Sequence, residues 1–305
     1  MFSLPGASQF TAAESRRLEK ILAVLVRAVV AGAAAVIGVR RSGELRTWLK
    51  TARELVTAAD ESSDAAILSV FRTELTAIDP TISFHLEESG RRGDGDSKWA
   101  GADPLDGTNH FACGGNLYAV QAHYVEAGLP LAGVVFQPEV YLPLSESPAP
   151  VGRLAAATRG SGATVRRSRF VHGQFRLGAA RPIERMQLPE PSGYVACVPF
   201  SGKMSDGERQ IVRRVQESGL IAVTTGAGGA AANVMMAIFG GHHVYANFGA
   251  GEDLDLIPAQ VIAIESGLTV WGTDRRPPVW NARKQPFIVA PDPGTAEKFL
   301  TAAGL

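Results

Sequence analysis

Apolar residues recur at spacings of three and four near the start of the chain. They are Leu18, Ile21, Leu22, Leu25 and Val29. Thr11 precedes this run, and Glu14 stands three residues after Thr11, which is the arrangement of a helix capping box. The period predicts a long helix over residues 12–41. A second helix is predicted over 63–77, because Pro80 follows soon afterwards.

From Ile82 onward the apolar runs become short or alternating, and glycine and proline separate them. This pattern predicts a mostly antiparallel sheet. A basic segment rich in turn residues follows over 160–181, and strands and helices alternate again from about Gly193. We expect a layered α/β (α+β) fold in two subdomains, residues 1–185 and 186–305.

The second half has a clear order of elements. Helices are predicted over 205–218, 229–239, 254–266 and 295–303, and strands over 221–224, 243–247, 268–271 and 286–290. At 305 residues the chain is long enough to bury a sizeable core. No repeat at a solenoid period is visible.

Residues 22–39 are apolar enough to raise the question of a membrane span, since about 20 apolar residues cross a bilayer. Arg27 interrupts the stretch, its alanines and glycines are weakly hydrophobic, and it lacks the pattern of a secretory signal. We therefore expect a buried helix and no contact with a membrane.

Charge and cysteine content exclude several classes of function. Thirty Lys and Arg residues balance thirty Asp and Glu residues, so the whole chain gives no reason to expect a nucleic acid as partner. Cys113 and Cys197 stand far apart, without CxxC or histidine-rich spacing. They indicate neither disulfides nor a zinc site, and they suit the reducing cytoplasm.

The segment 100–111 (AGADPLDGTNHF) carries the most informative chemistry. Asp103 and Asp106 flank a proline within one turn, and divalent cations best explain two carboxylates placed so close together. The amides of Gly107 and Thr108 would begin a helix, where backbone N–H groups can hold a phosphate. The alternative is a plain turn, since Asp, Pro and Gly are common turn residues.

Two further acidic segments stand apart from this turn. Glu87 and Glu88 end a predicted strand, so that one of them could reach the turn, or both could be a solvated strand end. Asp255 lies at the start of an apolar helix, where an acidic residue often only caps the helix. Asp253 competes with Asp255 for either role.

Four segments in this order together resemble the inositol monophosphatase family. This family comprises metal-dependent, lithium-sensitive phosphatases related to fructose-1,6-bisphosphatases and bisphosphate nucleotidases. The matching segments are 55–60 (LVTAAD), 86–89 (LEES), 99–111 (WAGADPLDGTNHF) and 254–267 (LDLIPAQVIAIESG). The resemblance spans about residues 14–290 and implies a layered αβαβα sandwich of the sugar-phosphatase type.

The resemblance also implies a set of site residues. Two or three Mg²⁺ ions would be bound by Glu87, Asp103, the Leu105 carbonyl, Asp106 and Asp255. The catalytic water would be positioned by Thr108, with Asp60 supporting it and Glu87 assisting. An all-oxygen ligand set favours magnesium over zinc, and four carboxylates carry about the charge that two divalent ions cancel.

The substrate positions depart further from the family pattern. Asn247 stands where inositol phosphatases carry a glutamate that bonds ring hydroxyls, and Gly228 and Gly229 would leave the neighbouring substrate wall bare or simply allow helix packing. Three other departures, Leu86, His110 and Leu254, remove no ligand. We expect His110 to be a packed or solvent-facing loop residue, with a pH-sensitive role beside the ligands as the alternative.

The expected activity is hydrolysis of a small polyol, sugar or amino-alcohol phosphate, with an inositol phosphate as the default. Alternative substrates are histidinol phosphate, fructose-1,6-bisphosphate and 3′-phosphoadenosine 5′-phosphate. Arg166, Arg167 and Arg169 form the one dense basic group, interpreted as a solvated turn rather than a second phosphate site. A catalytically silent relative that binds a phosphorylated metabolite is the alternative from another class. The resemblance further implies a homodimer.

Overall fold

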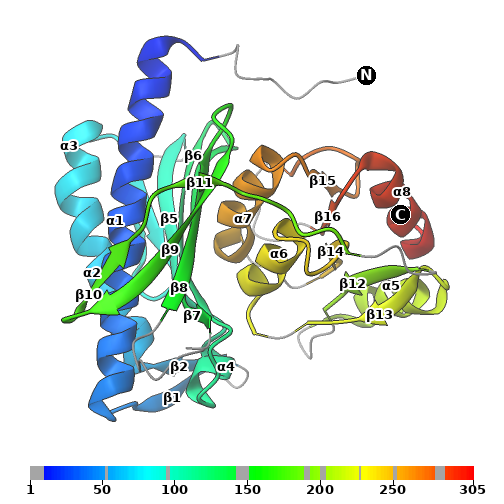
Figure 1. Ribbon diagram of the computed structural model, residues 1–305, viewed down its shortest axis with the longest axis horizontal. Helices are drawn as coiled ribbons and strands as arrows, with labels where there is room; N and C mark the ends of the chain where they lie inside the picture. The colour runs from blue at the N-terminus through cyan, green and yellow to red at the C-terminus, as the bar shows by residue number, and fades with distance from the viewer. Residues whose placement is uncertain are drawn as a thin grey trace.

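The computed structural model describes residues 10–51, 54–93, 97–141, 151–188, 193–199, 204–226, 228–249, 253–278 and 286–305. Its helices and sheets form five layers (Figure 1). Helices α1 and α2 cover one face of a large sheet, helices α6 and α7 lie between that sheet and a smaller one, and α5 and α8 cover the outer face of the smaller sheet. The predicted αβαβα layering is confirmed.

The first layer consists mainly of two helices. Helix α1 (Ala12–Ser42) begins at the predicted capping box and ends at Gly43, whose φ of 72° closes the helix in the left-handed region. Helix α2 (Ala58–Val70) continues through a π-helical turn, η2 (Phe71–Leu75), into the short α3 (Thr76–Ile78). A hairpin of β1 (Thr47–Thr51) and β2 (Glu54–Thr57) connects α1 to α2.

The second helix starts five residues earlier than the sequence predicts, at Ala58 rather than Ser63. Thr57 accepts the backbone N–H of Ala59, and Asp60 in turn accepts the backbone N–H of Thr57, so a capping box forms at this point. The polar first turn hides this start from an analysis of apolar period alone.

The large sheet has nine strands. Its order is β10–β9–β8–β7–β6–β5–β3–β4, with β11 paired to β9. The strands are β3 (Ser83–Leu86), β4 (Gly90–Arg92), β5 (Lys98–Asp106), β6 (Ala119–Glu126), β7 (Leu129–Tyr141), β8 (Val151–Thr158), β9 (Ala163–Val171), β10 (Gln174–Leu177) and β11 (Arg181–Pro182). A short helix, α4 (Thr108–Ala112), follows β5. Every pairing is antiparallel except that of β3 with β5, so the predicted mostly antiparallel sheet is confirmed.

The basic segment 160–181 forms strands β9, β10 and β11 instead of the predicted turns. Arg166, Arg167 and Arg169 all lie within β9. Ser168 and Phe170 between them are buried, so the segment has the alternating pattern of a half-buried strand. The number of arginines concealed this alternation.

The small sheet has five strands in the order β13–β12–β14–β16–β15. They are β12 (Tyr194–Cys197), β13 (Ile221–Thr224), β14 (Val244–Asn247), β15 (Thr269–Gly272) and β16 (Phe287–Ala290). Its helices are α5 (Asp206–Glu217), α6 (Ala230–Ile238), α7 (Asp253–Glu265) and α8 (Pro293–Ala303). These elements agree with the predictions to within two residues at each end, and the predicted boundary near residue 185 falls between β11 and β12.

Helix α1 is long and apolar enough to cross a membrane by length and composition, as the sequence suggests. One of its faces is buried in the core against α2 and the sheet. At Gly32 an added Cβ would lie 2.6 Å from Ser63 Oγ, so α1 and α2 approach closely there. This close packing sets the position of α2, which carries part of the site below.

Candidate active site

Asp103 and Asp106 lie on one face of β5 because of an irregularity in its pairing with β6. Asp103 lies opposite Gln121 and Asp106 opposite Ala119, so three steps along β5 match two along β6. Residues three apart in a regular strand face opposite sides of the sheet, and the extra residue of a bulge reverses this. Both carboxylates are buried, with 2% and 6% of the residue surface exposed. The bulge thus brings two acids together in the interior.

The turn between these acids is held by several hydrogen bonds. Asp103 Oδ1 accepts the backbone N–H of Leu105 at 2.8 Å, and Gln121 Nε2 approaches Asp103 Oδ2 at 3.4 Å. From α2, Ser63 Oγ donates to the Pro104 carbonyl at 2.8 Å. Gly107 then adopts a φ of 91°, which L side chains rarely take. The turn has little freedom to open.

Helix α2 supplies a polar chain that ends at Thr108. Thr57 donates from its backbone N–H and its Oγ1 to Asp60 Oδ2, at 2.8 and 2.6 Å. Thr108 Oγ1 lies 3.0 Å from Asp60 Oδ1 and 2.9 Å from the Leu105 carbonyl oxygen. Burial raises the pKa of Asp60, against the lowering effect of its hydrogen bonds from Thr57 and Thr108. The Thr108 hydroxyl has one proton to donate, so its lone pairs are available to a further donor such as water.

Glu87 and Glu88 follow β3 directly, beside the end of β5. The parallel register pairs Leu86 with Ala102, which places Glu87 next to Asp103 in the sheet. The backbone N–H groups of Glu88 and Ser89 both point at Asp64 Oδ1, at 3.3 Å. Glu87 is exposed and Glu88 half-buried, so the pair is neither wholly solvated nor wholly interior.

Asp64 is a residue that the sequence reasoning missed. It is buried, one turn after Asp60 on α2, and it orients the loop that carries Glu87 and Glu88. The signal was present in the sequence, because an acid four residues after Asp60 lies on the same helix face.

Asp106 connects the large sheet to helix α6. Its Oδ1 accepts the backbone N–H of Ala230 at 2.9 Å, and its Oδ2 accepts that of Ala231 at 3.0 Å. Burial raises its pKa to about 6, although these backbone N–H groups oppose the shift. A Cβ on Gly229 would lie 2.2 Å from Asp106 Oδ2, so only glycine admits this contact. Helix α6 therefore docks directly onto the acidic turn.

Asp255 lies in the first turn of α7, which packs against β5 and β7. The side chains of Asp253 and Asp255 are outside the described part of the structure. Among the described residues, no three His, Cys, Asp or Glu side chains converge to hold a metal ion. A cation site that includes Asp255 thus stays a prediction.

The described donors nonetheless suit a hard divalent cation. Asp103 and Asp106 share one buried face, the Leu105 carbonyl lies in the same turn, and every donor is oxygen. Burial penalises the ionised form of Asp106, and a nearby cation would offset that penalty.

Arg40, near the end of α1, holds the loop after Thr108, and the sequence reasoning missed this residue too. Its guanidinium donates to Glu139 Oε2 at 2.6 Å and to the Gly115 carbonyl at 2.8 Å, and it stacks 4.0 Å from the centre of the Phe111 ring. Tyr118 also donates to Glu139 Oε2, at 2.7 Å. Arg40 thus fastens the segment that follows the Asp-Gly-Thr turn.

Comparison with known proteins supplies the family. The family model described as the inositol monophosphatase family matches residues 17–303. The chain belongs to the inositol monophosphatase family. Membership in this family indicates a phosphatase, as the resemblance of the four segments implies.

Solved structures of family proteins share the fold. A suhB extragenic suppressor protein from Bartonella henselae has a TM-score of 0.70 and 22% identity, covering 93% of this chain and 98% of the other. The Anabaena inositol monophosphatase has a TM-score of 0.67 and 21% identity, covering 93% and 95%. That of Zymomonas mobilis has a TM-score of 0.68 and 16% identity, covering 97% and 100%.

The curated relatives match over shorter stretches. The Nus factor SuhB of Pasteurella multocida is 33% identical over 124 residues, which are 40% of this chain and 45% of that protein. The inositol-1-monophosphatase of Synechocystis is 35% identical over 88 residues, 28% of this chain and 29% of that protein. The matched stretches cover less than half of either curated relative.

The structure also locates the departures from the inositol monophosphatase pattern. Leu86 and Leu254 are buried core residues. His110 is half-buried and packs over Gly115, where a Cβ would lie 1.7 Å from His110 Nδ1. His110 thus lies on the short helix α4 rather than in a loop, and a pH-sensitive role beside the ligands stays a prediction.

The substrate positions predicted by resemblance have structural partners. Asn247 is buried at the end of β14, and its Oδ1 accepts the backbone N–H of Gly249 at 3.1 Å. A Cβ on Gly228 would lie 2.1 Å from the Leu117 carbonyl, and Gly229 lies against Asp106. These close contacts fit the alternative that the two glycines allow packing, and their contact with a substrate stays a prediction.

Proposed function

We propose that the protein is a Mg²⁺-dependent phosphomonoesterase that hydrolyses a small polyol, sugar or amino-alcohol phosphate. An inositol phosphate is the default substrate. The observation that carries the proposal is the chain Thr57–Asp60–Thr108, which ends beside the buried face of Asp103 and Asp106. A hydroxyl held by a buried carboxylate, next to clustered acids, is an arrangement suited to positioning a water for attack.

In the proposed reaction, water attacks phosphorus in line and the P–O bond to the alcohol breaks, which yields the free alcohol and inorganic phosphate. Thr108 Oγ1 donates to Asp60 Oδ1 and accepts a hydrogen bond from the attacking water. Asp60, held by two donors from Thr57, keeps the Thr108 hydroxyl in that orientation. Glu87, exposed beside Asp103, assists in accepting a proton.

The proposed ligands of the ions are Glu87, Asp103, the Leu105 carbonyl, Asp106 and Asp255. When bound, Mg²⁺ would lower the pKa of the attacking water and stabilise the negative charge that develops on the leaving oxygen. Asp106 has a further role in this proposal, because it keeps α6 and its glycine-rich approach against the site. Gly107 and Thr108 would contribute backbone N–H groups to the phosphate.

A binding protein without turnover is the second candidate. Both oxygens of Asp106 accept backbone N–H groups of α6, which limits how they could also bind a cation. One curated relative is named a Nus factor rather than a phosphatase. In this case phosphorylated metabolites would bind with saturation and release no phosphate.

A phosphatase panel tests the proposal. Phosphate release is measured with inositol 1-phosphate, histidinol phosphate, fructose-1,6-bisphosphate and 3′-phosphoadenosine 5′-phosphate, with Mg²⁺ and with EDTA. We expect turnover that EDTA abolishes, and a loss of about 10³-fold in Asp103→Asn, since a metal ion supplies several kcal/mol of stabilisation.

Asp274→Asn is the matched control, because Asp274 is exposed and outside the proposed site. As a second readout, Mg²⁺ should raise the melting temperature of the wild type and of Asp274→Asn but not of Asp103→Asn. Activity that EDTA leaves unchanged would sink the metal assignment. Saturable binding with no turnover would select the second candidate. A homodimer, lithium sensitivity and a cytoplasmic location remain parts of the proposal.

A further inference from the structure

Positive charge is concentrated in one part of this neutral chain. Residues 151–188 contain eight arginines, no lysine and one acidic residue, Glu184, whereas the whole chain has 30 basic and 30 acidic residues. The arginines are Arg153, Arg159, Arg166, Arg167, Arg169, Arg176, Arg181 and Arg185. The expectation of no nucleic-acid partner rested on the whole-chain balance, which conceals this segregation.

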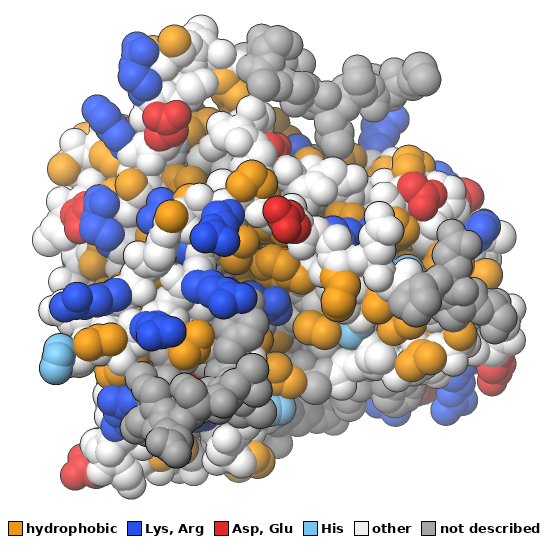
Figure 2. Space-filling model, in the orientation of Figure 1, with side chains coloured by type: hydrophobic (Ala, Val, Ile, Leu, Met, Phe, Trp, Pro, Cys, Tyr) orange, Lys and Arg blue, Asp and Glu red, His pale blue; other side chains and the backbone are white. Residues whose placement is uncertain are grey.

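The fold arranges four of these arginines on one face at an edge of the large sheet. Arg167 and Arg169 are exposed and two residues apart on β9, so they share a face. Arg176 on β10 lies directly opposite Arg169, and Arg181 on β11 lies opposite Val165, which is on the same face of β9. We call Arg167, Arg169, Arg176 and Arg181 the arginine face. In the space-filling view, Lys and Arg side chains gather over the region of β8, β9 and β10 (Figure 2).

Three of the four side chains on the arginine face do not use their charge in an ion pair with any residue that the structure describes. They are Arg169, Arg176 and Arg181. Like charges directly opposite on neighbouring strands, as in Arg169 and Arg176, are destabilising. Fold stability therefore does not explain why these side chains stand together.

A buried arginine on the neighbouring strand shares the side of the sheet that carries the arginine face. Arg153 on β8 lies opposite Arg167, with 8% of its surface exposed. Its Nε donates to Gln137 Oε1 at 2.7 Å, and its guanidinium lies 4.1 Å from the centre of the Phe239 ring.

We propose that the arginine face binds the phosphodiester backbone of a nucleic acid without reading its sequence. Residues 151–188 contain arginine but no lysine. The planar guanidinium group of arginine can donate two parallel hydrogen bonds to a phosphate. The two phenylalanines of this hairpin, Phe170 and Phe175, are buried, so bases cannot stack on their rings. Phosphate contacts without base contacts position a strand but carry no sequence information.

The same observations disfavour two other occupants. The exposed large apolar side chains of the described residues are elsewhere than on β8 to β11, whereas stable attachment to a membrane surface needs apolar burial as well as charge. A two-fold interface between copies of this chain would bring the same patch of each together, with arginine facing arginine. The test therefore also measures binding to anionic vesicles and the oligomeric mass of the protein.

The test measures binding of a fluorescent, mixed-sequence 20-mer, as single strand and as duplex, by anisotropy between 50 and 200 mM salt. Four contacts predict a slope of log Kobs against log salt of about −3 for the single strand, at about −0.7 per contact. The Arg169→Gln/Arg176→Gln variant should reduce this slope by about 1.4 and weaken binding at 50 mM salt by tenfold or more. Its melting temperature should be unchanged or higher, because like charges are removed.

Arg16→Gln/Arg92→Gln is the matched control, with the same net charge and two exposed arginines from α1 and β4. It should bind as the wild type does, and so should Asp103→Asn, because the arginine face is independent of the phosphatase proposal. Equal slopes for the two double variants would overturn the proposal. So would binding to phosphatidylserine vesicles or polyglutamate with no nucleic-acid binding at 50 mM salt, or a change in oligomeric mass on mutating the face.

Discussion

The two ends of the nine-stranded sheet treat charge differently. At β3 and β5, the carboxylates of Asp103 and Asp106 are buried, and neighbouring elements hold each of them. At β9 and β10, Arg169 and Arg176 are exposed and lie opposite each other without an ion pair among the described residues. In Figure 1, β9 and β10 lie nearer to the viewer than β5 does.

This difference separates two uses of a charged side chain. A buried charge is tolerable only where hydrogen bonds or a counter-charge replace water. Substitution of the residues that supply these interactions is therefore costly. An exposed charge keeps its hydration, so its position is loosely constrained and its effect reaches a partner through the field. Variants at the β5 end should therefore have large local effects, while those at the β9 end should act on binding alone.

The largest effect is expected from Thr108→Val. This change keeps the shape of the side chain and removes the hydroxyl that contacts Asp60 and Leu105. If the hydroxyl positions the catalytic water, kcat should fall by about 10²-fold or more with little change in KM. Thr81→Val is the control, since Thr81 is exposed, makes a similar bond to Asp79 at 2.6 Å and has no role in the proposed site. Equal activity of the two variants would exclude this role of Thr108.

Next in size is the cost of Gly229→Ala. The added Cβ would meet the Asp106 carboxylate at 2.2 to 2.3 Å, so the contact between β5 and α6 must shift. We expect a loss of about 1–3 kcal/mol in the free energy of unfolding, measured by denaturant titration. Gly207→Ala in α5 meets nothing within 4 Å and should stabilise the protein slightly. Two variants of equal stability would contradict the close approach.

A pH effect should come from His123, which lies on β6 among buried neighbours. Burial, with a smaller contribution from His85, lowers its pKa to about 3. Between about pH 6.5 and pH 3, His123 binds a proton in the unfolded state but not in the folded state. The free energy of unfolding should therefore fall as pH falls from about 6.5 towards 3. The slope from this group is at most about 1.4 kcal/mol per pH unit. His123→Leu should flatten the profile by that amount, and an unchanged slope would show that His123 is not responsible.

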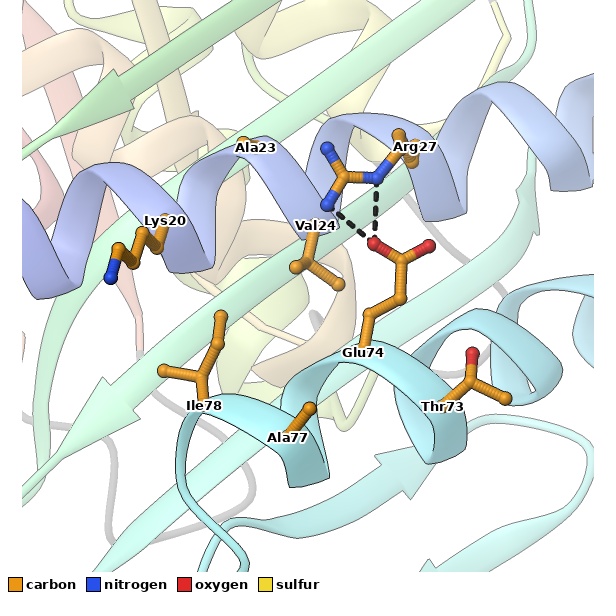
Figure 3. A pocket seen from close by; sticks show the side chains of 8 residues that line it. All are labelled: Lys20, Ala23, Val24, Arg27, Thr73, Glu74, Ala77 and Ile78. Carbon is orange, nitrogen blue, oxygen red and sulfur yellow. Dashed lines mark hydrogen bonds and ion pairs between the residues drawn. The ribbon is translucent and has the colours of Figure 1, made fainter.

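The smallest effect is expected from Arg40→Lys. Lysine cannot reach the Glu139 carboxylate and the Gly115 carbonyl with one planar group, so the loop after Thr108 should loosen at a cost of about 1–2 kcal/mol. Arg27→Lys is the matched control. Arg27 pairs with Glu74 across the groove between α1 and η2, which has a volume of about 480 Å³ (Figure 3). That pair is exposed, and its loss should change stability by about 0.5 kcal/mol or less. Equal costs would mean that Arg40 does not fasten the loop.

Much of the fold could be predicted from local pattern. Helix α1 begins at the Thr11 capping box, and the elements after Gly193 agree with their predicted ranges, because apolar period and turn residues act within a few positions. The start of α2 at Ala58 and the strands over 163–182 were predicted wrongly. In both places a run of polar or basic residues obscures the apolar periodicity from which helices and strands are predicted.

Only some residues of the candidate site could likewise be predicted from the sequence. Asp103 and Asp106 were found from their close spacing in the sequence, whereas the roles expected of Asp60 and Thr108 came from the resemblance to the inositol monophosphatase family. Asp64 and Arg40 were missed, since each acts on a segment many positions away, Ser89 for Asp64 and Gly115 for Arg40. That the Asp255 carboxylate lies beside Asp103 and Asp106 stays a prediction.

The sequence alone determined which residue types are available and where the elements begin, since capping, turn and periodic signals are local. Only the tertiary structure decided that Asp103 and Asp106 share a face, through a bulge that depends on β6, and that Asp106 meets α6 across 124 positions. It likewise decided that Arg169 and Arg176 lie side by side. Register and docking depend on pairings between distant segments, and no local propensity encodes those.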